Sequence, residues 1–139
     1  MLVRCLYASR IEGSLTPALL AEILQQSRKN NPSRGLTGML CYTPEFFVQV
    51  LEGGRQEVSH LLATLMRDPR HREMTVLLYE EIAERRFSSW SMGQVNIDKV
   101  NPGLLLKYSS RPALDPFTGS GQTVMSLLHE MIATGAIAG

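Results

Sequence analysis

The sequence is short of the features that usually identify a catalytic site. Its only two cysteines, Cys5 and Cys41, lie far apart on apolar segments, which indicates two small buried side chains in a reducing compartment rather than a disulfide. The three histidines, His60, His71 and His129, show no metal-ligand spacing and have no nearby thiol in the sequence. We therefore predict no metal site, and we expect each histidine at the surface.

Strong charge and long apolar runs are also absent. Lys and Arg number 14 against 13 Asp and Glu, so the formal net charge of +1 gives no field that would steer a polyanion, and we predict no direct binding of nucleic acid. No apolar stretch approaches the roughly 20 residues that span a bilayer, and the first residues are typical of a strand rather than a signal peptide. We expect a cytoplasmic protein with no membrane segment.

Two motifs that could suggest catalysis do not have the required geometry. Glu80 and Glu81 are adjacent on a predicted strand, so their side chains point to opposite faces and cannot share a proton. The glycine-rich stretch from Gly119 to Thr123 lacks the Lys-Ser/Thr pair of a phosphate-binding loop. We therefore predict that the protein is not an enzyme.

The order of predicted elements indicates one α+β domain. Strands are predicted at residues 2–8, 35–42, 46–52, 74–82 and 91–95, and amphipathic helices lie between the first two strands and after Gly53-Gly54. The first helix ends before Pro32 and the second ends at Asp68-Pro69. The order β-α-β-β-α-β-β is typical of a ferredoxin-like sheet with one added strand and both helices on one face.

The other face of this sheet also needs a cover. Along the third strand, Phe47 and Leu51 alternate with Phe46, Val48 and Val50, so both faces are largely apolar. Residues 97–139 contain two helical patterns with apolar stripes. We therefore divide the chain into a domain at residues 1–96 and a C-terminal helical cap and output region at residues 97–139.

Four polar residues occupy positions that the apolar pattern would bury. Tyr7 and Gln49 lie on neighbouring strands, and Ser27 and Asn31 lie four residues apart near the end of the first helix. Each alone is typical of an ordinary satisfied core or turn residue. Because buried polar groups need hydrogen-bond partners, the four together predict one shared binding site between the two helices.

Several strings in one fixed order carry a family resemblance. They are Leu6-Tyr7-Ala8-Ser9, Asn30-Asn31, Gly35-Leu36-Thr37-Gly38-Met39-Leu40, Phe47-Val48-Gln49-Val50-Leu51-Glu52-Gly53, Asp68-Pro69-Arg70-His71 and Trp90-Ser91-Met92. Together they resemble the BLUF family, the sensors of blue light using flavin, over residues 1–96. The remaining residues match only in kind, as the helical extension of short single-domain members.

The resemblance implies a flavin between the two helices, FAD or alternatively FMN. It makes Tyr7 the electron donor in a proton-coupled electron transfer to the excited flavin, and Gln49 the switch whose rearrangement changes the hydrogen bonds to the flavin and to Tyr7. An amide suits this role because it carries both a donor and an acceptor.

The resemblance also assigns residues around this pair. Asn31 would bind the polar edge of the flavin ring, with Asn30 and Ser27 beside it. Trp90 and Met92 would compete for the place next to Gln49, although ordinary strand packing explains both as well. Three charged residues at the end of the second helix would contact the flavin tail, or form only a solvated helix end: Arg67, Asp68 and Arg70.

We therefore predict a blue-light photoreceptor that signals in trans to a partner protein. By family analogy the partner would be a cyclic-dinucleotide enzyme or a transcription regulator, and the apolar C-terminal helices favour a homo-oligomer. Two alternatives stay open from sequence: a light-independent flavin oxidoreductase, and a ferredoxin-like regulatory module that binds a small metabolite.

Overall fold

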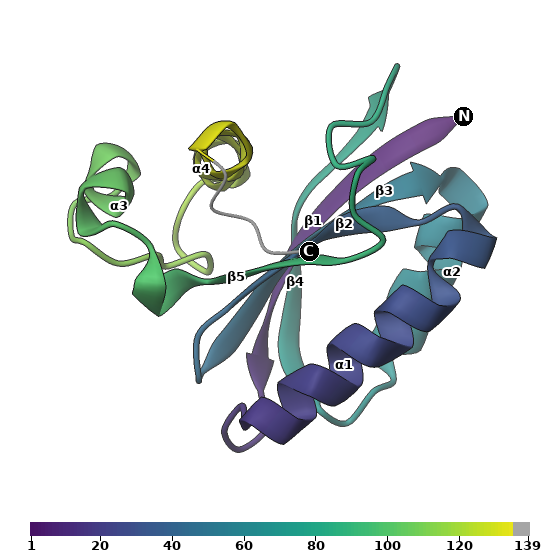
Figure 1. Cartoon of the computed structure of the whole chain (residues 1–139), viewed down its shortest axis with the longest axis horizontal. Helices are drawn as coiled ribbons and strands as arrows, with labels where there is room; N and C mark the ends of the chain where they lie inside the picture. The colour runs from purple at the N-terminus through teal and green to yellow at the C-terminus, as the bar shows by residue number, and fades with distance from the viewer. Residues whose placement is uncertain (135–139) are drawn as a thin grey trace.

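A single five-stranded sheet organises the chain (Figure 1). The structure is a computed structural model that describes residues 1–134 of the 139. In space the strands follow the order β4-β1-β3-β2-β5. Their bounds are β1 (Leu2–Ile11), β2 (Thr37–Tyr42), β3 (Phe46–Gly54), β4 (His71–Ile82) and β5 (Gly93–Asn96).

The strand directions confirm the predicted ferredoxin-like α+β fold. β1 pairs antiparallel with both β3 and β4, and β2 pairs antiparallel with β3. The added strand, β5, pairs parallel with β2 at the edge of the sheet. Three strands are longer than predicted, because β1 continues to Ile11, β3 continues to Gly54 and β4 already begins at His71.

Both long helices of the first part cover one face of the sheet, as predicted (Figure 1). Helix α1 (Pro17–Asn30) begins at Thr16, whose hydroxyl accepts a hydrogen bond of 3.1 Å from the backbone N–H of Leu19. Helix α2 (Arg55–Met66) follows β3 directly. Their apolar stripes pack on a buried cluster of the sheet: Tyr7, Ile11, Leu40, Phe47 and Leu51.

The opposite face is capped by the C-terminal helices, which confirms the predicted cover. This cover consists of α3 (Pro102–Tyr108) and α4 (Gly121–Thr134). A short 3₁₀ turn, η2 (Ile97–Lys99), lies between β5 and α3, and the other 3₁₀ turn, η1 (Pro32–Arg34), lies between α1 and β2. Buried side chains of α4 join Val48 and Val50 of β3 in one cluster. Residues 135–139 of the predicted cap region lie outside the described residues.

A buried ion pair fixes the segment between β4 and β5 to the sheet. Glu52 is fully buried and pairs with Arg4 at 2.7 Å. Its carboxylate also accepts hydrogen bonds from the backbone N–H groups of Arg86 and Phe87, the latter at 2.6 Å. Because a buried carboxylate needs such partners, this network holds the chain at residues 86–87 against β3.

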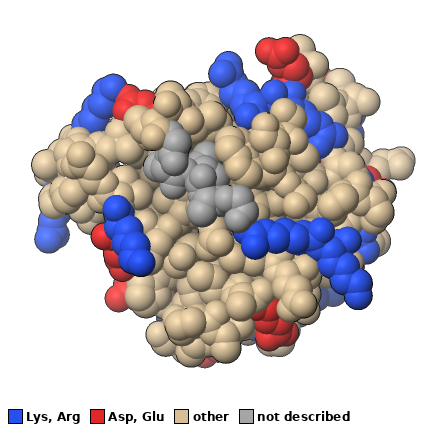
Figure 2. Space-filling model, viewed as in Figure 1, with Lys and Arg blue, Asp and Glu red and all other residues tan. Residues whose placement is uncertain are grey.

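The face of the molecule drawn in Figure 2 shows no concentration of one charge. In Figure 2, Lys and Arg side chains form several separate groups, some beside Asp or Glu, rather than one continuous stripe. Within residues 1–134, no helix combines the length and the apolar character needed to cross a membrane.

Candidate functional site

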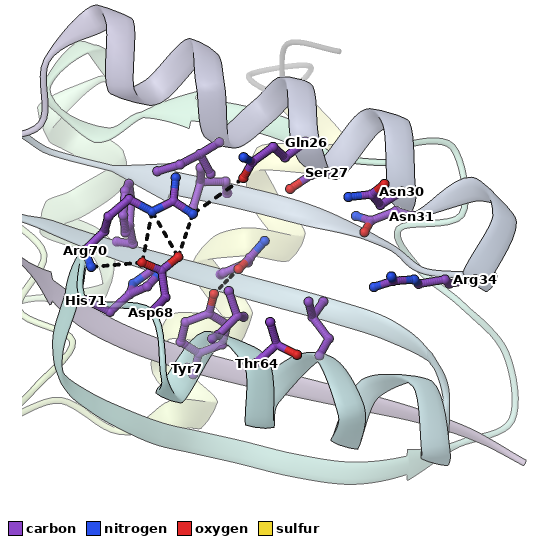
Figure 3. Close-up of a pocket in the computed structure, with 16 residues that line it drawn as sticks. Tyr7, Gln26, Ser27, Asn30, Asn31, Arg34, Thr64, Asp68, Arg70 and His71 are labelled. Atoms are coloured by element: carbon purple, nitrogen blue, oxygen red, sulfur yellow. Dashed lines mark hydrogen bonds and ion pairs between the residues drawn. The ribbon is translucent and has the colours of Figure 1, made fainter.

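A cavity of about 240 Å³ lies between α1 and α2, above the middle of the sheet. Figure 3 shows the polar side chains that surround it. Its apolar lining comes from both helices and the sheet: Ile23, Leu40, Phe47, Leu61 and Leu65. Its polar lining includes every member of the predicted convergent set: Tyr7, Ser27, Asn31 and Gln49.

Tyr7 and Gln49 form part of the floor of the cavity, and Gln49 also contacts Met92, which does not line it. Tyr7 and Gln49 lie opposite each other in the β1–β3 register, and the Tyr7 hydroxyl donates a hydrogen bond to the Gln49 amide oxygen. The Gln49 amide nitrogen in turn donates to the Met92 sulfur at 3.3 Å. Gln49 therefore uses its acceptor toward Tyr7 and its donor toward Met92, an arrangement that a flipped amide would reverse.

The environment keeps Tyr7 protonated. Its side chain is 1% exposed, and this burial raises the pKa of the phenol far above its ordinary value, with smaller contributions from Cys5 and Asp68. A neutral phenol retains the O–H that the bond to Gln49 requires. Tyr7 is therefore held as a hydrogen-bond donor across the physiological pH range.

The end of α1 supplies one polar wall. Ser27, Asn30 and Asn31 all line the cavity, and Asn31 is buried. The Asn31 side-chain nitrogen donates to the backbone oxygen of Ser91 at 2.8 Å. Asn31 thus links the cavity to the segment that precedes β5.

The end of α2 supplies a charged wall. Asp68 and Arg70 form a close pair, with Arg70 Nε 2.9 Å from one Asp68 carboxylate oxygen, and this bond lowers the pKa of Asp68. Arg70 also reaches the side-chain oxygen of Gln26 on α1 at 3.5 Å. As Figure 3 shows, Arg70 therefore connects the loop after α2 to Gln26 of α1 at one end of the cavity.

His71 contradicts the expectation of a surface histidine. The ring lines the cavity, lies 5.5 Å from the ring of Phe47, and its Nδ1 is 2.8 Å from the Ser9 hydroxyl. The expectation failed because β4 begins at His71, which places this side chain on the buried face. The expectation is also wrong for His129, whose Nε2 is buried under the cap, whereas His60 is exposed.

Three residues predicted for the site do not line the cavity: Trp90, Arg67 and Met92. Trp90 packs against the buried cluster under the C-terminal helices, and Arg67 is exposed at the end of α2. Met92, by contrast, is 1% exposed and touches Gln49. Of the Trp90–Met92 pair, it is therefore Met92 that lies beside the amide.

Sequence reasoning missed several residues of the lining. Gln26 and Ile23 have the helical spacing of Ser27 and Asn30, so the periodicity of α1 could have identified them. Arg34 and Thr64 carry no such signal, because a helix-end arginine and an exposed threonine are ordinary surface residues.

The arrangement suits a flat aromatic ligand with polar edges. Aliphatic side chains of the two helices offer surfaces on which a ring can lie, and amide, hydroxyl and guanidinium groups surround it. Arg34 and Arg70 add positive charge where an anionic tail could bind.

Comparisons with known proteins agree with this description. The profile of the BLUF family, described as sensors of blue-light using FAD, matches residues 2–93. A curated relative, the photoactivated adenylate cyclase subunit beta of Euglena longa, is 32% identical over 70% of this chain. The match spans only 12% of that relative's length.

Solved structures match nearly the whole chain. BlsA in its photo-activated state aligns over 95% of both chains with a TM-score of 0.83 and 29% identity. The dark state of BlrB, a BLUF protein, aligns over 96% of both chains with a TM-score of 0.79 and 34% identity. BlrP1 of Klebsiella pneumoniae with FMN and cyclic diGMP aligns over 97% of this chain and 35% of its own, with a TM-score of 0.71 and 27% identity.

Proposed function

Because the chain belongs to the BLUF family of flavin-based blue-light sensors, we propose that it detects light through Tyr7 and Gln49 and signals in trans to a partner protein. The chain is a blue-light sensor that binds a flavin, FAD or FMN. This membership disfavours both the light-independent oxidoreductase and the regulatory binding module. The observation that carries the proposal is the hydrogen-bonded series Tyr7–Gln49–Met92, whose first two members line the cavity.

The cavity residues divide into those that would hold the ring and those that would hold the tail. Asn31, Asn30 and Ser27 would bind the polar edge of the ring, and the aliphatic side chains of α1 and α2 would cover its faces. Arg70 and Arg34 would attract the phosphates, with Asp68 keeping the Arg70 side chain in place. We give Arg67 no role here, since it is exposed and lines no part of this cavity.

When bound, the flavin supplies the absorption of blue light and accepts an electron. Tyr7 supplies that electron, and as it is oxidised its phenolic proton moves along the existing hydrogen bond to the Gln49 amide oxygen. Tyr7 keeps this proton before it is oxidised, because a phenol is neutral at physiological pH and burial raises the pKa of Tyr7 further. When the electron and a proton have returned to Tyr7, the phenol is neutral again, and Gln49 would be left either as a rotated amide of unchanged composition or as its tautomer, in which one proton has moved from the amide nitrogen to the oxygen.

Gln49 makes the change persist. Once its amide is rotated or tautomerised, the group facing Tyr7 and the group facing Met92 exchange donor and acceptor character. The Met92 sulfur, a weak acceptor, then loses the N–H it now receives at 3.3 Å. Met92 is therefore the first residue outside the Tyr7–Gln49 pair to sense the change, and β5 begins at the next residue.

The signal would leave through β5 and the C-terminal region at residues 97–139. The packing of α3 and α4 on the sheet face behind β3 supports this, because these helices share one buried cluster with Val95 of β5. We propose a protein partner, either a cyclic-dinucleotide enzyme or a transcription regulator, and a homo-oligomeric sensor. The two buried, unpaired cysteines suit a reducing compartment such as the cytoplasm.

The absorption spectrum before and after blue light tests the photochemistry. We expect the purified protein to be yellow and to show a small, reversible red shift of the flavin band. Tyr7→Phe and Gln49→Leu should each abolish this shift while flavin remains bound. Tyr79→Phe, at a half-exposed phenol of β4, and Gln56→Leu, at an exposed amide of α2, are matched controls that should retain it.

Either of two results would overturn the proposal. One is a parent protein whose flavin band bleaches under light, since that indicates adduct or reduction chemistry. The other is a Gln49→Leu variant that keeps the full red shift, because leucine has no hydrogen-bonding group to rearrange.

A further inference from the structure

The segment before β5 is held by three hydrogen bonds on three consecutive backbone carbonyls. Gly38 N–H of β2 donates to the carbonyl of Trp90 at 3.0 Å, and the Asn31 side chain donates to that of Ser91 at 2.8 Å. Arg28 Nε donates to the carbonyl of Met92 at 3.3 Å. Two of these three donors are side chains of the last turn of α1 and the residue after it.

Arg28 contributes to this clamp without lining the flavin cavity. It precedes Asn31 by three residues, so the two side chains lie on the same side of the helix end. Its side chain is half-buried, and its Nη2 is enclosed without a hydrogen-bond partner among the described residues. Enclosing a charged donor without a hydrogen-bond partner costs free energy, so the side chain must gain a compensating contact in this position. Among the described residues, the acceptor that Arg28 contacts is the Met92 carbonyl.

We propose that Arg28 is a positioning residue that ties the Met92 backbone to the end of α1 and so keeps the Met92 sulfur beside Gln49. A thioether is a weak acceptor, so the Gln49–Met92 contact alone cannot hold this segment in place. The backbone bonds from Arg28 and Asn31 do so instead. The dark arrangement of the switch thus depends on a residue that touches neither the cofactor cavity nor Tyr7.

The clamp also makes α1 part of the output. A movement of Met92 that follows the Gln49 rearrangement must stretch or break the bond to Arg28, and Asn31 joins the same helix end to the cavity. This second step rests on the proposed function, whereas the positioning role can be measured without flavin or light.

The test compares Arg28→Met with Lys29→Met. Both changes remove one cation from the last turn of α1, so any effect on the helix dipole is matched, but Lys29 is exposed and is not part of the clamp. In flavin-free protein we expect Arg28→Met to raise amide hydrogen exchange at residues 92–96 about tenfold, which corresponds to about 1.4 kcal/mol. Trp90 is the only tryptophan, so its quenching by acrylamide should increase in parallel.

Arg28→Lys is the conservative variant that separates positioning from folding. A lysine ammonium can donate to the Met92 carbonyl, so this variant should keep exchange near the parent level. Equal hydrogen exchange in Arg28→Met and Lys29→Met would overturn the proposal. Loss of the folded state in both Arg28→Met and Arg28→Lys would also overturn it, because the lysine variant should keep the bond to the Met92 carbonyl.

Light adds a readout that separates this proposal from the photochemistry. With flavin bound, Arg28→Met should keep the red shift but change the rate of dark recovery about tenfold relative to Lys29→Met. Recovery that is identical in the two variants would overturn the role of the clamp in signalling. If the parent shows no red shift, the proposed function fails, while the exchange result still decides the positioning role.

Discussion

Glu52 is the residue on which the sheet and the β4–β5 connection most depend. Its carboxylate is fully buried and is satisfied by Arg4 and by two backbone N–H groups of the connection. Arg4 pairs on its other side with Glu80, whose side chain is 38% exposed. Arg4 thus lies between the buried carboxylate of Glu52 and the partly exposed carboxylate of Glu80.

We expect Glu52→Gln to lower the free energy of unfolding by about 3–5 kcal/mol, because it leaves the buried Arg4 charge without its enclosed partner. Glu80→Gln removes the same charge from the exposed side of the pair and should cost about 1 kcal/mol or less. Urea unfolding of flavin-free protein measures both. Equal losses would show that the burial of Glu52 does not determine the strength of its pairing.

At this scale the sequence identified some buried polar residues and missed others. Tyr7, Gln49 and Asn31 were predictable because they interrupt apolar patterns that are otherwise regular. Arg4 and Glu52 were missed, because a charged residue on a strand is ordinarily a sign of an exposed position. Only their pairing across the β1–β3 register makes their burial tolerable, and pairing between strands distant in sequence is not visible in a local pattern.

The helices and strands were largely predictable, because the signals that define them lie in residues next to one another in the sequence. Helix ends at Asn31-Pro32 and Asp68-Pro69, and strands with apolar faces, depend on neighbouring residues only. Which of Trp90 and Met92 lies beside Gln49 was not predictable, since the segment before β5 has no periodicity. Its place is set by donors from Gly38 and Arg28, which lie more than 50 residues away in sequence.

The contact between α4 and β4 gives a prediction at the scale of elements. A Cβ atom on Gly121, the first residue of α4, would lie 2.4 Å from the backbone oxygen of Leu77. Because that neighbour is backbone, it cannot move away cheaply. We expect Gly121→Ala to lower the free energy of unfolding by about 1–3 kcal/mol through overpacking.

A loss of stability in Gly121→Ala would indicate a steric clash, because alanine has a higher helix propensity than glycine and would otherwise be neutral or stabilising. Gly54→Ala, just before α2, is the matched control, because a Cβ there meets nothing within 4 Å. Thermal unfolding of the three proteins measures the difference. A Gly121→Ala variant as stable as Gly54→Ala would mean that α4 does not start against β4.

In the whole molecule, the sheet separates two apolar interiors that serve different purposes. Tyr7 and Gln49 face the cavity under α1 and α2, while their neighbours Leu6 and Val50 face the cluster under α4. The alternation of strand side chains puts these two sets one residue apart. A structural change at Gln49 would therefore have only the thickness of one sheet to cross before it reached the C-terminal helices.

The cap carries a titratable group that links its packing to pH. His129 of α4 has its Nε2 buried without a partner among the described residues. Burial lowers the pKa of His129, and the charges of Arg86 and Arg4 lower it further, while Glu52 and Glu80 oppose them. Burial also lowers the pKa of His71, which lines the cavity between α1 and α2.

These two histidines predict acid sensitivity of the whole fold. Below their ordinary pKa of 6.5, the unfolded chain binds protons that folded His129 and His71 do not, so the free energy of unfolding should fall as pH drops from 7 toward 5. His129→Leu should reduce this slope, with His71 accounting for part of the remainder. His60→Leu, at an exposed position of α2, should keep the slope of the parent. Urea unfolding of flavin-free protein at several pH values measures all three, and an unchanged slope in His129→Leu would show that the cap accommodates a charged imidazole.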